Sequence, residues 1–122
     1  MKTGIIVFAH GSRVEPANEG VRAVARELAL ATGCQRVVAA FLELGQPDLE
    51  SAANTMAAEG VERIVVIPYF LTPGLHLERD LPRLVGRISE QHKDLQIIAT
   101  APLDGHRGLV EILADRVRTA LD

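Results

Sequence analysis

The feature that most constrains the fold is a fourfold alternation of short apolar runs and amphipathic stretches. Apolar runs rich in β-branched residues occupy positions 4–9, 37–42, 64–69 and 95–101. Runs of this length without polar alternation are typical of parallel strands that are covered on both faces. An amphipathic stretch follows each run, so the chain is expected to alternate strand and helix four times.

The helical stretches are recognised by apolar residues that recur at helical spacing. They are Val21, Val24, Ala25 and Leu28; Leu49, Ala52, Ala53 and Met56; Leu77, Leu81, Leu84, Val85 and Ile88; and Leu109, Ile112, Leu113, Val117 and Leu121. Each stripe is one face wide, which predicts that each helix covers a sheet. The second helix is expected to begin near Pro47, and Gly33 and Gly60 mark the ends of the first two helices.

Four strand–helix units predict one α/β domain over residues 1–122. Such a domain has a four-stranded parallel sheet, right-handed crossovers and helices on both faces, which makes three layers. The simplest strand order is 2-1-3-4. Ligands in open α/β sheets bind outside the carboxyl ends of the strands where the order reverses. We therefore expect a site in the loops after Ala9 and Tyr69.

Composition narrows the possible partners. The 13 Lys and Arg residues and 16 Asp and Glu residues give a net charge of −3, and no basic run is present, which argues against nucleic acid. No 18-residue apolar run is present, so no membrane span is predicted. Cys34 is the single cysteine and no signal peptide is visible, so a cytoplasmic protein is expected.

Both loops at the predicted site carry a histidine, His10 and His76. Neighbouring strands lie about 5 Å apart, so the two imidazoles are expected to face one cleft. Imidazole binds transition metals and acts as a base near neutral pH. Either histidine alone also fits a cap or turn residue, but their coincidence at one edge favours a functional pair.

Glu43 ends the second strand and lies at the same edge. It is interpreted as an oxygen ligand or proton acceptor, with an ordinary solvated carboxylate as the alternative. His10, Glu43 and His76 together fit a catalytic metal site that keeps open positions. His106 follows the fourth strand and is expected to be a cap or rim residue.

Three arginines, Arg13, Arg79 and Arg107, follow strands at this edge. Guanidinium groups pair well with carboxylates, so the three, together with Ser12, are predicted to bind a polycarboxylate substrate. The alternative is that the arginines only keep the surface soluble. The sequence around Ser12 lacks a nucleophile elbow, and the single Gly11 does not make a dinucleotide fingerprint.

These motifs resemble those of the small class II chelatases, the short form of the sirohydrochlorin cobaltochelatases and ferrochelatases. The resemblance covers essentially the whole chain. It rests on VFAHGSR at 7–13, FLE at 41–43, IPYFL at 67–71 with Gly74 and His76 downstream, and PLDGH at 102–106.

The resemblance implies a chelatase-like fold and insertion of a divalent metal ion, cobalt, iron or nickel, into sirohydrochlorin. Insertion of cobalt would serve cobalamin synthesis, and insertion of iron would serve sirohaem synthesis. His10 and His76 match the metal-handling and catalytic histidines, and Glu43 matches an acidic residue that assists metal binding. The metal is a substrate, so no permanently bound cofactor is expected. Short members act as homodimers, because two such domains share one cleft.

The chemistry agrees with these residue types. The ring must lose two pyrrole protons, which requires bases beside it. The metal must be held and then released, which favours an incomplete ligand set. Imidazole must be neutral to ligate, so activity is expected to fall in acid.

Three alternatives remain at this point. The first is a carrier that binds a tetrapyrrole or a metal without turnover. The second is one half of a larger assembly with a different partner chain. The third is a flavodoxin-like binding module. The last alternative predicts that both histidines can be replaced without loss.

Overall fold

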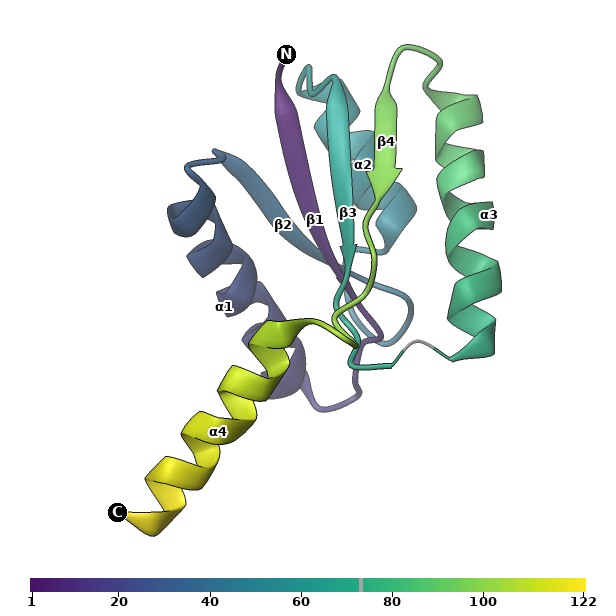
Figure 1. Cartoon of the computed structure of the whole chain (residues 1–122). Helices are drawn as coiled ribbons and strands as arrows, with labels where there is room; N and C mark the ends of the chain where they lie inside the picture. The colour runs from purple at the N-terminus through teal and green to yellow at the C-terminus, as the bar shows by residue number, and fades with distance from the viewer. Residues whose placement is uncertain (73) are drawn as a thin grey trace.

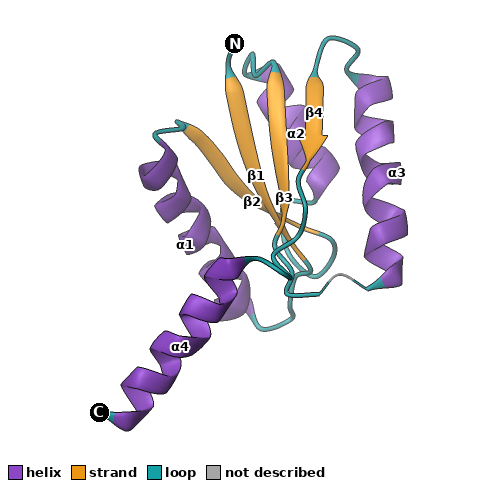
Figure 2. Ribbon diagram, viewed as in Figure 1, coloured by secondary structure: helices purple, strands orange, loops and turns teal. Residues whose placement is uncertain are grey.

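The computed structural model confirms the fourfold alternation (Figures 1 and 2). It describes residues 1–72 and 74–122, except for the side chain of His76. The strands are β1 (Thr3–Ala9), β2 (Arg36–Phe41), β3 (Arg63–Pro68) and β4 (Gln96–Ala99). The helices are α1 (Glu15–Thr32), α2 (Leu49–Ala58), α3 (Leu75–Gln91) and α4 (Arg107–Leu121).

The sheet has the predicted order β2-β1-β3-β4, and all of its pairs are parallel. The strand order reverses at β1, whose neighbours on its two sides are β2 and β3. Hydrogen bonds continue past the strand ends, since Leu42 N donates to Ala9 O at 2.9 Å and Tyr69 N donates to Phe8 O at 2.7 Å. The carboxyl ends of the three strands are therefore held side by side, as a switch-point site requires.

Two apolar clusters lie on opposite faces of the sheet. On one face Ile6, Phe8 and Ile64 are buried under α2 and α3. On the other face Val7 and Phe41 are buried against α1. Alternate residues of a strand point to opposite faces, so β1 contributes to both clusters. The three-layer arrangement with helices on both faces is confirmed.

The prediction that every helix covers the sheet is wrong for α4. None of the fifteen residues of this fully described helix is buried. Figure 1 shows α4 leaving the sheet and extending past the carboxyl ends of the strands. Leu103 N donates to Phe70 O at 3.3 Å, which ties the preceding loop to the end of β3. An apolar stripe predicts that a helix needs an apolar partner, but it does not say where that partner lies.

The helix ends follow from local chemistry. Gly33 ends α1 in the left-handed conformation with φ 70°, as predicted. The second helix begins two residues after Pro47, because the Asp48 carboxylate caps it by accepting from Ser51 N at 2.8 Å. In the described part of the chain, no helix has both the length and the apolar character needed to cross a membrane.

Candidate functional site

His10 and Glu43 lie together at the carboxyl edge of the sheet, as predicted. His10 directly follows β1, and Glu43 lies two residues after β2. His10 Nε2 is 3.7 Å from Glu43 Oε1, and the two side chains are 59% and 58% exposed. Glu43 N also donates to His10 O at 3.1 Å, so backbone pairing continues from the strands into the site. The two side chains are fixed at their bases and open to an incoming ligand.

Gly11 makes this close approach possible. Its φ of 95° lies in the left-handed region that favours glycine. A Cβ atom at this position would lie 1.7 Å from Glu43 O. The loop that carries His10 therefore lies directly against the backbone of Glu43, with no room for a side chain.

The Asn18 side chain hydrogen-bonds to both the His10 loop and the Glu43 loop. The sequence analysis did not identify this residue as part of the site. This α1 side chain is 1% exposed, and its Oδ1 accepts from Ser12 N at 2.9 Å. Its Nδ2 donates to Ser12 O and to Leu44 O, each at 2.9 Å. Leu44 has a φ of 58°, in the left-handed region that residues other than glycine rarely adopt. A polar residue within a helical pattern gave no signal that it would be buried.

An ion-pair network extends from this clamp. Asn18 Nδ2 donates to Glu15 Oε2 at 3.2 Å, and Arg22 Nη1 donates to Glu15 Oε1. The hydrogen bond from Arg22, followed by that from Asn18, lowers the pKa of the Glu15 carboxyl below its usual 4.5. Arg22 Nη2 also donates to Gln46 O at 3.1 Å, so the network links α1 to the loop that follows Glu43.

The remaining predicted site residues lie on elements that end or begin at the same edge. Ser12 and Arg13 follow His10 in one loop, and the Ser12 hydroxyl accepts from Val14 N at 3.0 Å. Arg79 lies in the first turns of α3, with its Nε 3.5 Å from Asp80 Oδ1, and Arg107 begins α4. His76 is the second residue of α3, but its side chain lies outside the described residues, so its pairing with His10 stays a prediction.

The cap interpretation of His106 is confirmed, because its Nδ1 accepts from Gly108 N at 2.8 Å at the start of α4. His92, at the end of α3, contacts Asn54 with 2.7 Å between Nε2 and Oδ1. His92 thus makes its contact away from this edge, whereas His106 lies at the edge as a helix cap.

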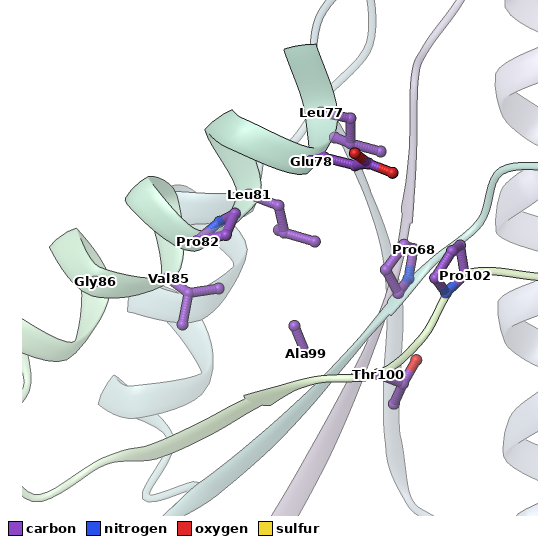
Figure 3. Close-up of a pocket in the computed structure, with 10 residues that line it drawn as sticks. All are labelled: Pro68, Leu77, Glu78, Leu81, Pro82, Val85, Gly86, Ala99, Thr100 and Pro102. Carbon is purple, nitrogen blue, oxygen red and sulfur yellow. The ribbon is translucent and has the colours of Figure 1, made fainter. Parts of the chain in front are cut away.

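An apolar hollow of about 500 Å³ opens beside this edge between α3 and the ends of β3 and β4. Figure 3 shows Leu81 and Val85 of α3 facing Pro68, Ala99 and Thr100 across it. Within the described residues no group of three His, Cys, Asp or Glu side chains is placed to hold a metal. Among the described residues, His10 and Glu43 are thus the two predicted metal-binding side chains that lie together, and an apolar surface lies beside their edge of the sheet.

The CbiX family model matches residues 4–120, nearly the whole chain. The chain belongs to the CbiX family. Sequence identity is 32% with the chloroplastic sirohydrochlorin ferrochelatase of Arabidopsis thaliana, where the match covers 97% of this chain and 52% of the relative. It is 30% with the sirohydrochlorin cobaltochelatase of Methanothermobacter thermautotrophicus, over 98% of this chain and 94% of the relative.

A solved CbiX protein from Marinobacter aquaeolei VT8 superposes with a TM-score of 0.82 and 30% identity, covering 98% of this chain and 97% of that one. The chain thus spans about half of the plant relative and nearly all of the archaeal and Marinobacter ones. The family match confirms the resemblance seen in the sequence.

Proposed function

We propose that this CbiX chain inserts a divalent metal ion into sirohydrochlorin, releasing two protons for each metal incorporated. The family match over residues 4–120 carries the proposal, and both relatives named above are sirohydrochlorin chelatases. Cobalt is the first candidate metal, with iron and nickel next, since imidazole and carboxylate ligands suit all three.

The geometry of His10 and Glu43 supports a role in holding the metal before transfer. Metal–nitrogen and metal–oxygen bonds to such ligands are about 2.0–2.2 Å long. Two ligand atoms 3.7 Å apart can therefore both reach one ion at an angle of about 120°. The remaining coordination positions stay open to the ring nitrogens of the substrate. His76 is the proposed third ligand.

His10 and Glu43 also account for the removal of the two pyrrole protons. When the metal moves from His10 to a ring nitrogen, the Nε2 lone pair is freed and accepts a pyrrole proton. The Glu43 carboxylate accepts the second proton or passes it to water. The apolar hollow beside Pro68 and Leu81 would receive a face of the ring, and Arg13, Arg79 and Arg107, with Ser12, would bind its carboxylates.

We further propose a homodimer, because one four-stranded edge is narrow beside a tetrapyrrole, and a cytoplasmic location, consistent with a single cysteine. The dimer and the location are predictions that can be tested independently of the proposed reaction.

A multiple-turnover assay distinguishes an enzyme from a carrier. Purified protein, sirohydrochlorin and Co²⁺ are mixed without oxygen, with the ring in at least tenfold excess over protein, and ring absorbance is followed. Conversion of more than one ring per chain, faster than without protein, supports the enzyme. A stoichiometric burst without further turnover would instead identify a carrier. Repeating the assay with Fe²⁺ and Ni²⁺ ranks the metals.

A further inference from the structure

The loop that carries Glu43, residues 42–47, is closed at its base. Phe41 N donates to Pro47 O at 2.9 Å, so the loop leaves and rejoins the sheet edge at one place. Gly45 lies against the Phe41 ring, since a Cβ atom at this glycine would be 2.8 Å from the ring atom Cγ. Because the loop is short and closed, a shift of the arm that follows Gly45 also moves the arm that carries Glu43.

Arg22 of α1 holds the arm of this loop that lies away from Glu43. Its Nη2 donates to Gln46 O at 3.1 Å, and its guanidinium carbon lies 5.3 Å from the centroid of the Phe41 ring. Within the part of the chain that the structure describes, no hydrogen bond or ion pair joins Arg22 to the loop of His10. Arg22 therefore acts on one of the two site loops.

The guanidinium group of Arg22 is fixed before it meets the loop. Its Nη1 pairs with Glu15 Oε1 and lies 3.4 Å from Glu19 Oε2. The Arg22 side chain is 29% exposed, against 65% for Arg26, one turn later in α1. A planar guanidinium group held in this way loses little further freedom when a second nitrogen donates. Because exposed ion pairs stabilise a fold only weakly, the arrangement is better explained by the loop that Nη2 holds.

We propose that Arg22 is a positioning residue for metal binding, which holds the Glu43 carboxylate within reach of His10 through Gln46 and Phe41. The inference rests on the proposed function, in which Glu43 and His10 hold the incoming metal ion. The Glu43 side chain is 58% exposed, so its position depends on the backbone that carries it. Binding groups must be held to within about 0.5 Å of the productive geometry, which is a demand on that backbone.

Arg22 and Asn18 are expected to have different effects on the reaction. Asn18 ties the Glu43 loop to Ser12, beside His10, so its loss disturbs a metal ligand and a base together. Arg22 contacts the Glu43 loop alone, so its loss should weaken metal binding and leave the base in place. An Arg22 variant should therefore need more Co²⁺ but reach nearly the same maximal rate.

The sign of the effect separates positioning from charge. The guanidinium group is positive, so through-space electrostatics alone would let a divalent cation bind more tightly after its removal. Positioning predicts weaker binding. Arg22→Met removes the charge and the donors but keeps a long unbranched side chain beside Phe41. Arg22→Lys keeps the charge but has no second nitrogen to reach Gln46, so both variants should bind Co²⁺ more weakly.

Titration of the full chain with Co²⁺ alone, without sirohydrochlorin, measures the affinity directly. We expect the dissociation constant to rise about 10-fold in Arg22→Met and in Arg22→Lys, the low end for loss of a residue that supports a metal ligand. Arg26→Met is the matched control, because Arg26 pairs with Glu19 at 3.0 Å on the same helix, and it should change the constant by less than about twofold. In the insertion assay, the KM for Co²⁺ should rise as the dissociation constant does, with the maximal rate within about twofold of wild type.

A double-mutant cycle with Glu43→Gln shows whether Arg22 acts through Glu43. If it does, Arg22→Met should raise the dissociation constant by no more than about a further twofold when Gln already stands at position 43. An effect of about 10-fold that persists in the Glu43→Gln background would overturn the proposal. Co²⁺ binding that is unchanged or tighter in Arg22→Met would also overturn it, as would a wild-type affinity that does not depend on Glu43.

Two further measurements keep the outcomes distinct. If circular dichroism shows that Arg22→Met is unfolded, the cycle is run with Arg22→Lys, which retains the pairing with Glu15. Metal binding does not require the ring, so a chain without turnover would contradict the proposed reaction while the cycle still decides the role of Arg22.

Discussion

Glu43 is joined to His10 twice, once through the backbone, with 3.1 Å from Glu43 N to His10 O, and once through the side chains, with 3.7 Å from Oε1 to Nε2. The backbone bond extends the β1–β2 pairing past the end of both strands. Sheet pairing therefore sets the spacing of the two backbones at the site, and the Asn18 side chain holds together the loops that follow them. A change that separates the two backbones should impair the site without touching either side chain.

Gly11→Ala is such a change. Its Cβ would meet Glu43 O at 1.7 Å and would require an unfavourable positive φ, so the two loops must separate. We expect metal insertion to fall by at least about 100-fold and stability by about 1–3 kcal/mol. Gly20→Ala is the matched control, because Gly20 lies within α1 with nothing within 4 Å of its Cβ position. It should gain about 0.5–1 kcal/mol and keep its activity. An active and stable Gly11→Ala protein would contradict this account of the loop.

Asn18→Ala tests the clamp beneath the loops. The substitution leaves Ser12 N and the carbonyls of Ser12 and Leu44 without their partner, which should cost about 1–3 kcal/mol by urea denaturation. Metal insertion should also fall at a temperature where the variant is folded, because the His10 loop is no longer tied to that of Glu43. Asn54→Ala, an exposed asparagine of α2, should change stability by only about 0.5 kcal/mol. Equal effects of the two variants would argue against a positioning role for Asn18.

Glu43→Gln separates metal binding from folding. The amide keeps the size of the side chain but loses the charge that attracts a divalent ion. We expect Co²⁺ affinity, followed by the visible absorption of the bound ion, to fall by about 10-fold or more, which corresponds to about 1.4 kcal/mol. Glu111→Gln, on the exposed surface of α4, is the control and should not change affinity. Unchanged Co²⁺ binding in the Glu43 variant would remove Glu43 from the ligand set.

The lowered pKa of Glu15 predicts a pH-dependent contribution to stability. A carboxyl whose pKa is depressed by folding stabilises the protein above its usual value, here 4.5, and this stabilisation is lost as the pH falls through the folded pKa. Wild type should therefore be more stable than Glu15→Gln at pH 7, with the difference shrinking below pH 4.5. Added salt should reduce the difference at pH 7, since the ion pair is exposed. A difference that is constant from pH 7 to pH 3 would contradict the proposed cause.

The architecture of the sheet could be predicted from the sequence, because apolar runs mark the strands directly and helical spacing marks the helices between them. Parallel pairing, the 2-1-3-4 order and the placement of His10 and Glu43 at one edge all followed from it. Asn18 could not be found, because its burial depends on a carbonyl of Leu44, 26 residues away. The position of α4 could not be found either, because its apolar stripe is equally satisfied by a surface on the same chain or on another.

The most direct measurement is the initial rate of Co²⁺ insertion into sirohydrochlorin by His10→Ala, compared with wild type and with His92→Ala. His92 carries the same side chain, but it lies at the end of α3, away from the functional edge, where it contacts Asn54 of α2. We predict that the His10 variant loses at least about 100-fold in rate, as expected for removal of a base and ligand, while the His92 variant stays within about twofold of wild type. A His10→Ala protein that inserts cobalt at the wild-type rate would contradict the assignment of the metal site to this edge.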